Sequence, residues 1–301
     1  MKQIIIIFVF ISINLYSETK FLVFGGNGWI GSKICRILEE KNYNVYLAKS
    51  RLEDRESIAK EIKEICPNFV INAAGKTGIS SVDWCEDHKQ ETIRSNVLGA
   101  LNLVDVCYKN NIHVTNLSTG CIYQGYPENG FTEKDEPNFL GSFYSRTKIL
   151  LEKLIINYPN VLHLRIKMPI SSDLSPRSFV VKITKYKKII NMPNSVSILD
   201  DLLPLVPEMC LLELTGIFNF VNPGILSHNQ VLELYKKYID NNFKYTNFTV
   251  EEQNAILKSQ RSNCSLDASK LLAVFPYIPD AKDSIIKVFE KIKALNEYDK
   301  L

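Results

Sequence analysis

Tyr144 and Lys148 lie in the segment YSRTK, and their types and spacing indicate a first chemical role. One helical turn separates them, so their side chains share one face of a helix. A tyrosine in such a pair can give a proton to a carbonyl oxygen during hydride delivery, and the lysine ammonium stabilises the phenolate that remains. On spacing alone, however, a tyrosine and a lysine four residues apart usually form an ordinary surface pair.

Two hydroxyl groups and a thiol follow one another in STGCIY, residues 118–123. Ser118 and Thr119 end a short apolar run that is typical of a buried parallel strand, and ligands bind at the carboxyl ends of such strands. Cys121 follows Thr119 by two residues, and alternate residues of an extended chain share a face. The competing interpretation of Cys121 is a small buried hydrophobe, which free cysteines usually are.

A glycine-rich segment, GGNGWIG, follows the first apolar run and opens an amphipathic stretch. Gly25, Gly28 and Gly31 would permit a tight turn, close packing of helix on strand, and the approach of a pyrophosphate to backbone N–H groups at a helix N-terminus. Because the strand and the helix stand on the correct sides of this turn, the pattern predicts a dinucleotide site.

The end of the second apolar run, AKSRLED, bears on the choice between the two nicotinamide cofactors. An acidic residue there would bind a ribose hydroxyl, whereas a basic residue would bind the 2′-phosphate. Ser50 and Arg51 occupy this tip, so NADPH is predicted. Glu53 and Asp54 lie nearby and leave NADH open.

Short apolar runs alternate with longer amphipathic stretches after Lys20, which predicts an α/β fold with a Rossmann-type, doubly wound parallel sheet. Beyond Pro169 the spacing loosens and prolines become frequent, as expected for a smaller substrate-binding lobe. The predicted division is a dinucleotide-binding domain at 19–168 and, at 169–301, mainly the lobe with interleaved elements. Expected strands cover 21–25, 43–48, 69–75, 113–118 and 161–169, and expected helices cover 28–41, 91–110 and 143–158.

Composition excludes several classes of function. The 301 residues carry a formal net charge of only +3 with scattered lysines and arginines, so no nucleic-acid partner is expected. The seven cysteines are odd in number and form no CxxC pair, which indicates neither a disulfide framework nor a metal site. A reducing, cytoplasmic compartment is the natural interpretation.

The N-terminus departs from that picture. Residues 1–18, MKQIIIIFVFISINLYSE, place one lysine before an apolar run that is too short to span a bilayer, in the outline of a signal peptide. The segment is predicted to be signal-like or a simple extension, which leaves secretory targeting open. No surface for a membrane partner is visible after residue 18.

Taken together, these segments resemble the extended short-chain dehydrogenase/reductases, which carry GxxGxxG, a Ser or Thr after a central strand, and YxxxK. More narrowly, the chain resembles the bifunctional 3,5-epimerase/4-reductases that complete UDP-L-rhamnose, relatives of dTDP-4-dehydrorhamnose reductase and GDP-fucose synthase. The likeness covers nearly everything after Thr19, including VDWCEDHK at 82–89, ETIRSNVLGAL at 91–101, RIKMPISSDLSPRSF at 165–179 and RSNCSLDASKL at 261–271.

The resemblance implies a role for each reacting group. Thr119 supplies a hydroxyl, Tyr144 donates the proton, and Lys148 holds the cofactor ribose and adjusts the acidity of Tyr144. Cys121 and Lys182 would exchange protons at C3 and C5 of the sugar, since Lys182 in PRSFVVKI matches a lysine of the rhamnose-type enzymes where the fucose-type enzymes have a histidine. The competing interpretation of Lys182 is a solvated helix residue beside other lysines.

The resemblance also implies binding residues. The predicted cofactor set is Gly25, Gly28, Trp29, Ile30, Gly31, Ser50, Arg51, Ala73, Ala74, Gly75, Asn96, Tyr144 and Lys148. For the nucleotide diphosphate it indicates Arg261, Asn263 and Arg177, for which surface salt bridges are the competing interpretation. Thr77 and Trp84 are expected to border the sugar. A homodimer formed through 91–110 and 143–158 is expected as well.

The leading hypothesis is an NADPH-dependent enzyme that epimerises UDP-4-keto-6-deoxyglucose at C3 and C5 and reduces C4, giving UDP-L-rhamnose. An alternative is a 4-reductase alone, acting on a dTDP- or UDP-ketosugar that another protein has epimerised. A second alternative, from another class, is a regulatory subunit that binds NADP without catalysis. Residue types leave the choice between UDP and dTDP open.

Overall fold

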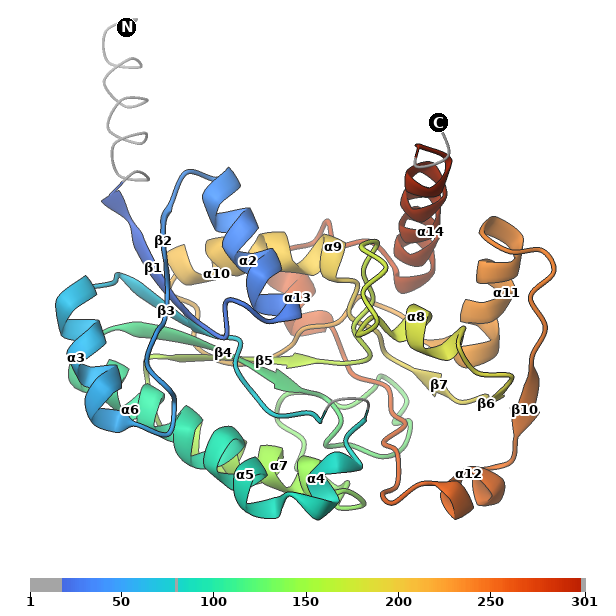
Figure 1. The fold of residues 1–301 in the computed structure, drawn as a ribbon, viewed down its shortest axis with the longest axis horizontal. Coiled ribbons are helices and arrows are strands. Elements are labelled where there is room, and N and C mark those ends of the chain that lie inside the picture. The colour runs from blue at the N-terminus through green and yellow to red at the C-terminus, as the bar shows by residue number, and fades with distance from the viewer. Residues whose placement is uncertain (1–17, 79–80, 299–301) are drawn as a thin grey trace, which may run out of the picture.

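The computed structural model describes residues 18–78 and 81–298, within which six strands form one parallel sheet (Figure 1). The strand order is β2-β1-β3-β4-β5-β8, so the direction of strand addition reverses beside β1. Such a switch point opens a crevice at the carboxyl ends of the strands. The prediction of a Rossmann-type parallel sheet is confirmed. The strands are β1 (Lys20–Phe24), β2 (Asn44–Leu47), β3 (Phe69–Asn72), β4 (His113–Thr119), β5 (Val161–Ile166) and β8 (Gly216–Asn219).

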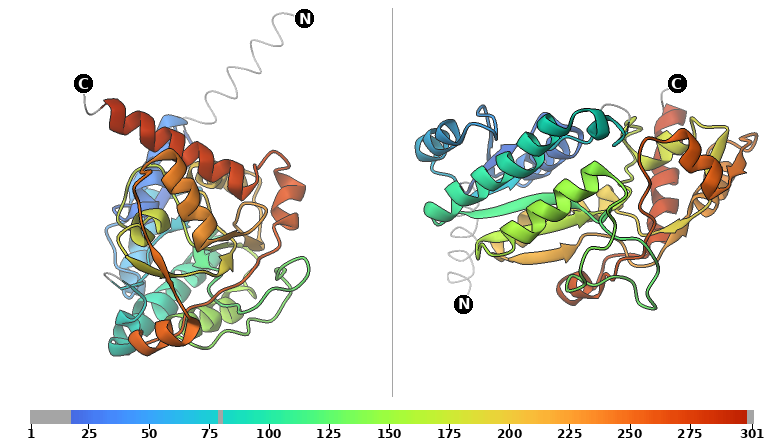
Figure 2. Two further views of the ribbon diagram at one scale, coloured as in Figure 1. Left: turned by 90° about the vertical axis from the view of Figure 1, so that its right-hand side faces the viewer. Right: turned by 90° about the horizontal axis from the view of Figure 1, so that it is seen from below.

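Helices cover both faces of the sheet, as Figures 1 and 2 show. Successive side chains of β1 point to opposite faces of the sheet and pack into two hydrophobic clusters. Phe21 and Val23 belong to one cluster, and Leu22 and Phe24 belong to the other. The first face carries α2 (Trp29–Glu40), α9 (Leu199–Leu202), the short η2 (Leu203–Leu205), α10 (Val206–Leu211) and α13 (Ser269–Val274). The second carries α3 (Arg55–Ile65), α6 (Ala100–Lys109) and α7 (Phe143–Ile155).

The helix expected at 91–110 is interrupted. It consists of α5 (Lys89–Ile93), a π-helical turn η1 (Arg94–Gly99) and α6, and the short α4 (Trp84–Asp87) precedes it. Likewise, the strand expected at 161–169 ends at Ile166, because the backbone of Lys167 leaves the sheet to bond Ser197 and Met168 takes a left-handed conformation with φ of 41°. Helix periodicity and apolar runs do not report such local departures.

The lobe lies beyond the carboxyl ends of the strands, on the right of Figure 1. Its own core joins α8 (Phe179–Ile183), α11 (His228–Tyr238) and α14 (Ala281–Tyr298). The remaining elements are β6 (Lys188–Ile190), β7 (Pro193–Asn194), β9 (Leu226–Ser227), β10 (Thr246–Phe248) and α12 (Val250–Ile256). Because β8 and α13 follow residue 169 yet pack with the sheet, the second half of the chain contributes elements to both the sheet and the lobe. The domain boundary at 168 stays a prediction.

The segment predicted to be signal-like, residues 1–18, lies outside the described residues apart from Glu18. Within the described ranges, no helix is long and apolar enough to cross a membrane.

A buried ion pair anchors α7 to the sheet. Glu152 accepts hydrogen bonds from Arg165 on β5, with Nε at 2.9 Å and Nη2 at 2.6 Å, and its Oε2 lies 3.2 Å from Nε2 of His163. Burial alone would raise the pKa of Glu152, but the bonds from Arg165 and His163 lower it to about 2. Burial also lowers the pKa of His163, which is therefore neutral. The pair fixes the helix that carries Tyr144 and Lys148.

We expect Glu152→Gln to lower the free energy of unfolding by about 3 kcal/mol, because it leaves Arg165 buried without a counter-charge. Since the folded-state pKa of Glu152 is about 2 against an ordinary 4.5, this stabilisation is complete above pH 4.5 and is lost as the pH falls toward 2. Urea titrations of both proteins across that range measure it.

The matched control is Glu136→Gln, which removes an exposed ion pair between Glu136 and Lys153 of the same helix. We expect it to change the free energy of unfolding by less than about 0.5 kcal/mol. Equal losses in the two variants would contradict the anchoring role of Glu152.

Candidate active site

The phosphate-binding turn is closed too tightly for side chains. Gly25 has φ of +73°, and a Cβ atom there would lie 2.6 Å from the backbone nitrogen of Ala74. A Cβ atom on Gly31 would lie 2.1 Å from the carbonyl oxygen of Gly25. The turn after β1 therefore lies directly against the turn after β3, and only glycine permits the approach.

Helix α2 begins behind this turn. Gly28 is its N-cap and has no side chain to bond the first N–H groups, which are left to a ligand such as a pyrophosphate. Ile30 packs against the core. Trp29 also packs there, and its Nε1 donates to Asp173 (2.8 Å), which pairs with Lys33 as well. Trp29 thus joins the cofactor turn to the segment after β5, a contact that the sequence did not indicate.

The tip of β2 presents the exposed guanidinium of Arg51. Glu61 accepts hydrogen bonds from the backbone nitrogens of Lys49 and Ser50 and from the Ser50 hydroxyl, so Ser50 is held within the protein. The side chain of Arg51 is exposed and makes no hydrogen bond or ion pair among the described contacts, while its carbonyl accepts from the backbone nitrogen of Asp54. Asp54, a source of doubt about the cofactor, caps α3 by accepting from the backbone of Ser57.

The turn after β3 brings the cofactor and catalytic residues together. A Cβ atom on Gly75 would lie 3.4 Å from Oδ1 of Asn96 and 3.7 Å from Nζ of Lys148. Asn96, in the π-helical turn, is buried and binds both the backbone nitrogen (2.7 Å) and the carbonyl (2.8 Å) of Lys76. The amide of Asn96 therefore fixes the turn that contains Ala73, Ala74 and Gly75. The glycine cradle, the uncapped helix and this turn fit a dinucleotide.

Thr119, Tyr144 and Lys148 are buried together at the end of β4. Burial raises the pKa of Tyr144, Cys121 adds to the rise, and a hydrogen bond from Thr119 opposes it. Burial lowers the pKa of Lys148 to about 8, with Cys85 opposing the change. Tyr144 is thus a neutral proton donor beside a lysine that can lose or gain charge near neutral pH.

Cys121 lies in the same pocket. Its backbone nitrogen donates to Oγ1 of Thr119 (3.0 Å), and its carbonyl accepts from the hydroxyl of Ser145 (2.6 Å). The sulfur lies 3.6 Å from Nζ of Lys167, a fully buried lysine. Sequence reasoning missed Lys167, although a lysine directly after an apolar strand, in RIKMP, was a visible signal.

Lys182 lies on α8, where its side chain is exposed. Within the described part of the chain, no hydrogen bond or ion pair joins it to Cys121. Partial burial of the ammonium lowers the pKa of Lys182, and the charge of Arg177 lowers it further, so these two predicted residues lie near each other. Their roles in catalysis and diphosphate binding stay predictions.

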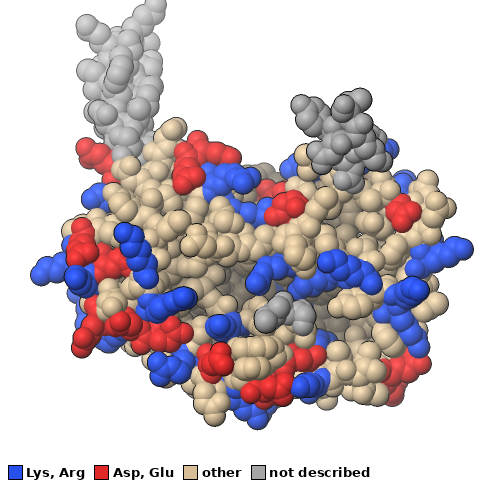
Figure 3. Space-filling model, viewed as in Figure 1, with Lys and Arg blue, Asp and Glu red and all other residues tan. Residues whose placement is uncertain are grey.

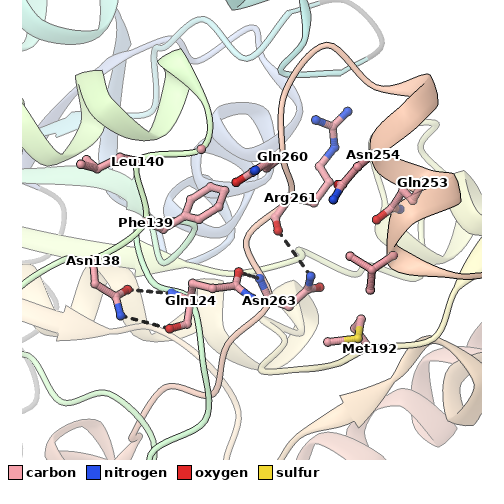
Figure 4. A pocket seen from close by; sticks show the side chains of 12 residues that line it. Gln124, Asn138, Phe139, Leu140, Met192, Gln253, Asn254, Gln260, Arg261 and Asn263 are labelled. Atoms are coloured by element: carbon pink, nitrogen blue, oxygen red, sulfur yellow. Dashed lines mark hydrogen bonds between the residues drawn. The ribbon is translucent and has the colours of Figure 1, made fainter.

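A cavity of about 570 Å³ lies between the sheet and the lobe (Figure 4). Arg261 and Asn263, two of the residues predicted to bind the diphosphate, line it. The side chain of Arg261 is engaged, however, because its Nη1 and Nη2 each lie 2.9 Å from an oxygen of Asp83. Arg261 lowers the pKa of Asp83 to about 2, against the effect of burial, so the carboxylate is charged. Asp83 was absent from the predicted set.

Amide side chains form much of the remaining lining. The side-chain amide of Asn138 accepts from the backbone nitrogen of Gln124 (2.8 Å) and donates to its carbonyl (3.0 Å). Oε1 of Gln124 accepts from the backbone nitrogen of Asn263 (2.9 Å). Figure 4 shows these bonds beside Phe139, Gln260 and Met192. Polar amides around one aromatic ring can bind a flat heterocycle by stacking and hydrogen bonds.

Trp84 stacks on His88, with ring centroids 4.0 Å apart, and the ammonium of Lys76 lies 5.7 Å from its ring. Trp84 therefore packs at the start of α4, and its role beside the sugar stays a prediction. Thr77 is exposed and has no hydrogen bond among the described contacts. Lys and Arg side chains surround the hollow in the middle of the face seen in Figure 3. Among the described residues, no cluster of His, Cys, Asp or Glu could hold a metal ion.

We expect Lys148 to titrate near pH 8, because its buried ammonium is poorly solvated, against an ordinary value of 10.5. NMR of protein with ¹³C-methylated lysines measures this directly, and the resonance absent from Lys148→Arg identifies the residue. A Lys148 signal that shifts only as the pH approaches 10.5 would contradict the effect of burial.

Comparison with known proteins agrees with this geometry. Residues 21–171 match the NAD dependent epimerase/dehydratase family. The chain is 49% identical to a bifunctional dTDP-4-dehydrorhamnose 3,5-epimerase/dTDP-4-dehydrorhamnose reductase of Arabidopsis thaliana, over 92% of this chain and 95% of the relative. It is also 49% identical to a trifunctional UDP-glucose 4,6-dehydratase/UDP-4-keto-6-deoxy-D-glucose 3,5-epimerase/UDP-4-keto-L-rhamnose-reductase of that plant, over 91% of this chain but only 42% of the longer protein.

A solved structure gives the same result. The UDP-rhamnose synthase of Acanthamoeba polyphaga mimivirus superposes with a TM-score of 0.88 at 41% identity, over 91% of this chain and 99% of that protein. Family, relatives and fold agree on a protein that uses a nicotinamide cofactor and a nucleotide sugar. The chain belongs to the NAD dependent epimerase/dehydratase family.

Proposed function

We propose that this protein epimerises UDP-4-keto-6-deoxy-D-glucose at C3 and C5 and then reduces C4 with NADPH, giving UDP-L-rhamnose. The observation that carries the proposal is the meeting of Thr119, Tyr144 and Cys121 in one pocket, so that a proton-exchanging sulfur lies beside the groups that bind a carbonyl oxygen. The bifunctional and UDP-rhamnose-forming relatives described above support it.

The epimerisation requires removal of a proton from a carbon next to the ketone and return of a proton to the opposite face. Cys121 removes the proton from carbon, and the electron pair of the C–H bond moves into an enolate. The hydroxyls of Thr119 and Tyr144 stabilise the enolate oxygen by hydrogen bonds. Lys182 gives a proton to the other face, and the ketone forms again.

The reduction uses the same two hydroxyls, of Thr119 and Tyr144, to bind the oxygen on C4. A nicotinamide held by the glycine turn and Lys148 would supply the hydride for C4. Tyr144 donates its phenolic proton to the oxygen, and the adjacent ammonium of Lys148 stabilises the phenolate. Because the oxygen keeps the same hydrogen-bond partners throughout, one pocket serves both reactions.

NADPH is the proposed cofactor. Arg51 is an exposed, unengaged cation at the tip of β2, where a 2′-phosphate would lie, and Asp54 is occupied as a helix cap. A guanidinium binds a phosphate through charged, bidentate hydrogen bonds.

The diphosphate and nucleoside of the substrate are proposed to occupy the cavity lined by Arg261 and Asn263. Arg261 pairs with Asp83 in this structure, so the diphosphate would share the guanidinium with a carboxylate. Arg177 and Thr77 are exposed and complete the proposed substrate set together with Trp84.

We also propose a homodimer that acts in the cytoplasm. Apolar side chains are exposed on the outer face of α6, α7 and their neighbours, which lie side by side in Figure 2, and such a face is commonly an interface. They are Ile93, Leu98, Tyr108, Leu150, Leu154 and Ile156. The cysteines at 35, 66, 85, 107, 121, 210 and 264 are all free, which favours a reducing compartment.

Proton NMR in deuterium oxide, with the ketosugar and without NADPH, tests the central proposal. We expect deuterium to enter at C3 and C5, and rhamnose to appear only when NADPH is added. Cys121→Ser should slow the exchange at least about 100-fold, because it removes the proton acceptor. Cys66→Ser, which changes an exposed thiol at the end of α3, is the matched control and should leave it unchanged. An absence of deuterium exchange in the wild type would contradict the proposed epimerase activity and would favour a 4-reductase alone.

Arg51→Ala should raise the KM for NADPH about 10-fold or more, through loss of a charged hydrogen bond to the 2′-phosphate, and should leave the KM for NADH nearly unchanged. Steady-state kinetics with both cofactors measure this, and Lys60→Ala, an exposed cation on α3, is the control. An equal rise for both cofactors would show that Arg51 does not read the 2′-phosphate.

A further inference from the structure

Lys167 is a buried lysine for which the proposed reaction scheme has no role so far. Its side chain is completely excluded from solvent. Its Nζ donates to the carbonyl oxygen (3.0 Å) and the hydroxyl (2.8 Å) of Ser262 and lies 3.6 Å from Sγ of Cys121. An ammonium has three donors, and these three acceptors use all of them.

The charge of Lys167 lacks an obvious counter-ion. None of the ion pairs between described residues includes it, and buried charges in proteins are usually paired. Of its three acceptors, only the thiol of Cys121 can become an anion at moderate pH. Burial raises the pKa of the neighbouring Cys264 and outweighs the charge of Lys167, which lowers it, so Cys264 stays a neutral thiol. Within the described ranges, Cys121 is therefore the group in reach of Nζ that can balance the ammonium.

We propose that Lys167 is the positioning residue that holds Cys121 as a thiolate for the epimerisation. This rests on the proposed function. The thiolate takes a proton from the carbon next to the ketone, the electron pair of the C–H bond moves into the enolate, and the sulfur becomes a neutral thiol. Lys167 keeps its own protons throughout, and its charge favours the thiolate when the proton leaves again.

The position of the sulfur supports this role. Thr119 and Ser145 bind the backbone of Cys121, and Lys167 contacts its side chain. These contacts hold the sulfur beside the hydroxyls of Thr119 and Tyr144, where the carbonyl oxygen of the sugar would bind. Lys167 is itself fixed, because its backbone nitrogen donates to Ser197 (3.0 Å) and Ser262 donates to the carbonyl of Tyr123 (2.6 Å). Reduction at C4 requires neither group.

The other titratable groups around the pair are uncharged at neutral pH. Among the described residues they are Tyr144 on α7, Cys264 in the segment 261–266 and His228 at the start of α11. Burial raises the pKa of Tyr144 and of Cys264 and lowers that of His228. A change in proton exchange at neutral pH when Lys167 is substituted therefore reports on the contact between Lys167 and Cys121.

Lys167→Met tests the proposal with two readouts on one protein. We expect deuterium exchange at C3 and C5 to fall roughly 10- to 100-fold at neutral pH, since an adjacent opposite charge changes ionisation by about that factor. The loss should shrink as the pH rises. NADPH oxidation with the ketosugar that is already epimerised should change by less than about threefold. Lys167→Arg should recover much of the exchange. Lys185→Met, which changes an exposed lysine two residues beyond the end of α8, is the control.

Exchange that is unchanged in Lys167→Met, while the wild type exchanges normally, would overturn the proposal and leave the proposed function standing. A parallel loss of exchange and reduction would overturn it too, because it would indicate a merely structural role. An absence of exchange in the wild type would instead remove the proposed function.

A second measurement needs no variant and so does not depend on the folding of Lys167→Met. Alkylation of wild-type protein with iodoacetamide, resolved by mass spectrometry of peptides, compares Cys121 with the exposed Cys66. We expect the ratio of the rates at neutral and alkaline pH to be nearer to one for Cys121, because the thiolate is the reactive form. The same pH dependence for both cysteines would overturn the proposal.

Discussion

The buried pair of Glu152 and Arg165 is the interaction on which the active site depends. Tyr144, Lys148 and Glu152 recur at intervals of four residues, so the face of α7 that bears the reacting groups is also the face that is bound to β5. Removing an ion pair from water is costly, and in a helix that had only to pack, apolar residues would serve as well. A bidentate pair, however, sets the rotation and the height of the helix, which apolar packing fixes less strictly.

Around this fixed helix, the remaining groups arrive from the ends of parallel strands. The turn after β1 and the turn after β3 touch through glycine, and Asn96 ties the second turn to the π-helical segment η1. The π-helical turn allows the side chain of Asn96 to face the backbone of Lys76, while the helix continues on both sides of the turn. The end of β4 then contributes Thr119 and Cys121 on the same side.

The sequence predicted those parts of the site that depend on local pattern. Glycine spacing, YSRTK and STGCIY each report a turn, a helix face or a strand end, and the structure brings these residues together. The sequence pattern could not report contacts between segments that are far apart along the chain. Lys167 meets Ser262 across a separation of 95 residues, and Asp83 meets Arg261 across 178. Apolar periodicity likewise could not locate the end of β5 at Ile166, which depends on a bond to Ser197.

The segment that carries Arg261 and Asn263 is also held by backbone bonds on two sides. It pairs with the sheet side through parallel bridges from Gly125 to Cys264 and from Phe131 to Leu266, while the backbone nitrogen of Ser195 binds the carbonyl of Cys264 from the lobe side. A hinge opening between the sheet and the lobe would break these backbone bonds in the interior. The inner wall of the cavity is therefore fixed by backbone bonds to both sides, and its shape does not depend on how the lobe moves as a whole; α12 contributes Val250, Gln253 and Asn254 to the rest of the lining.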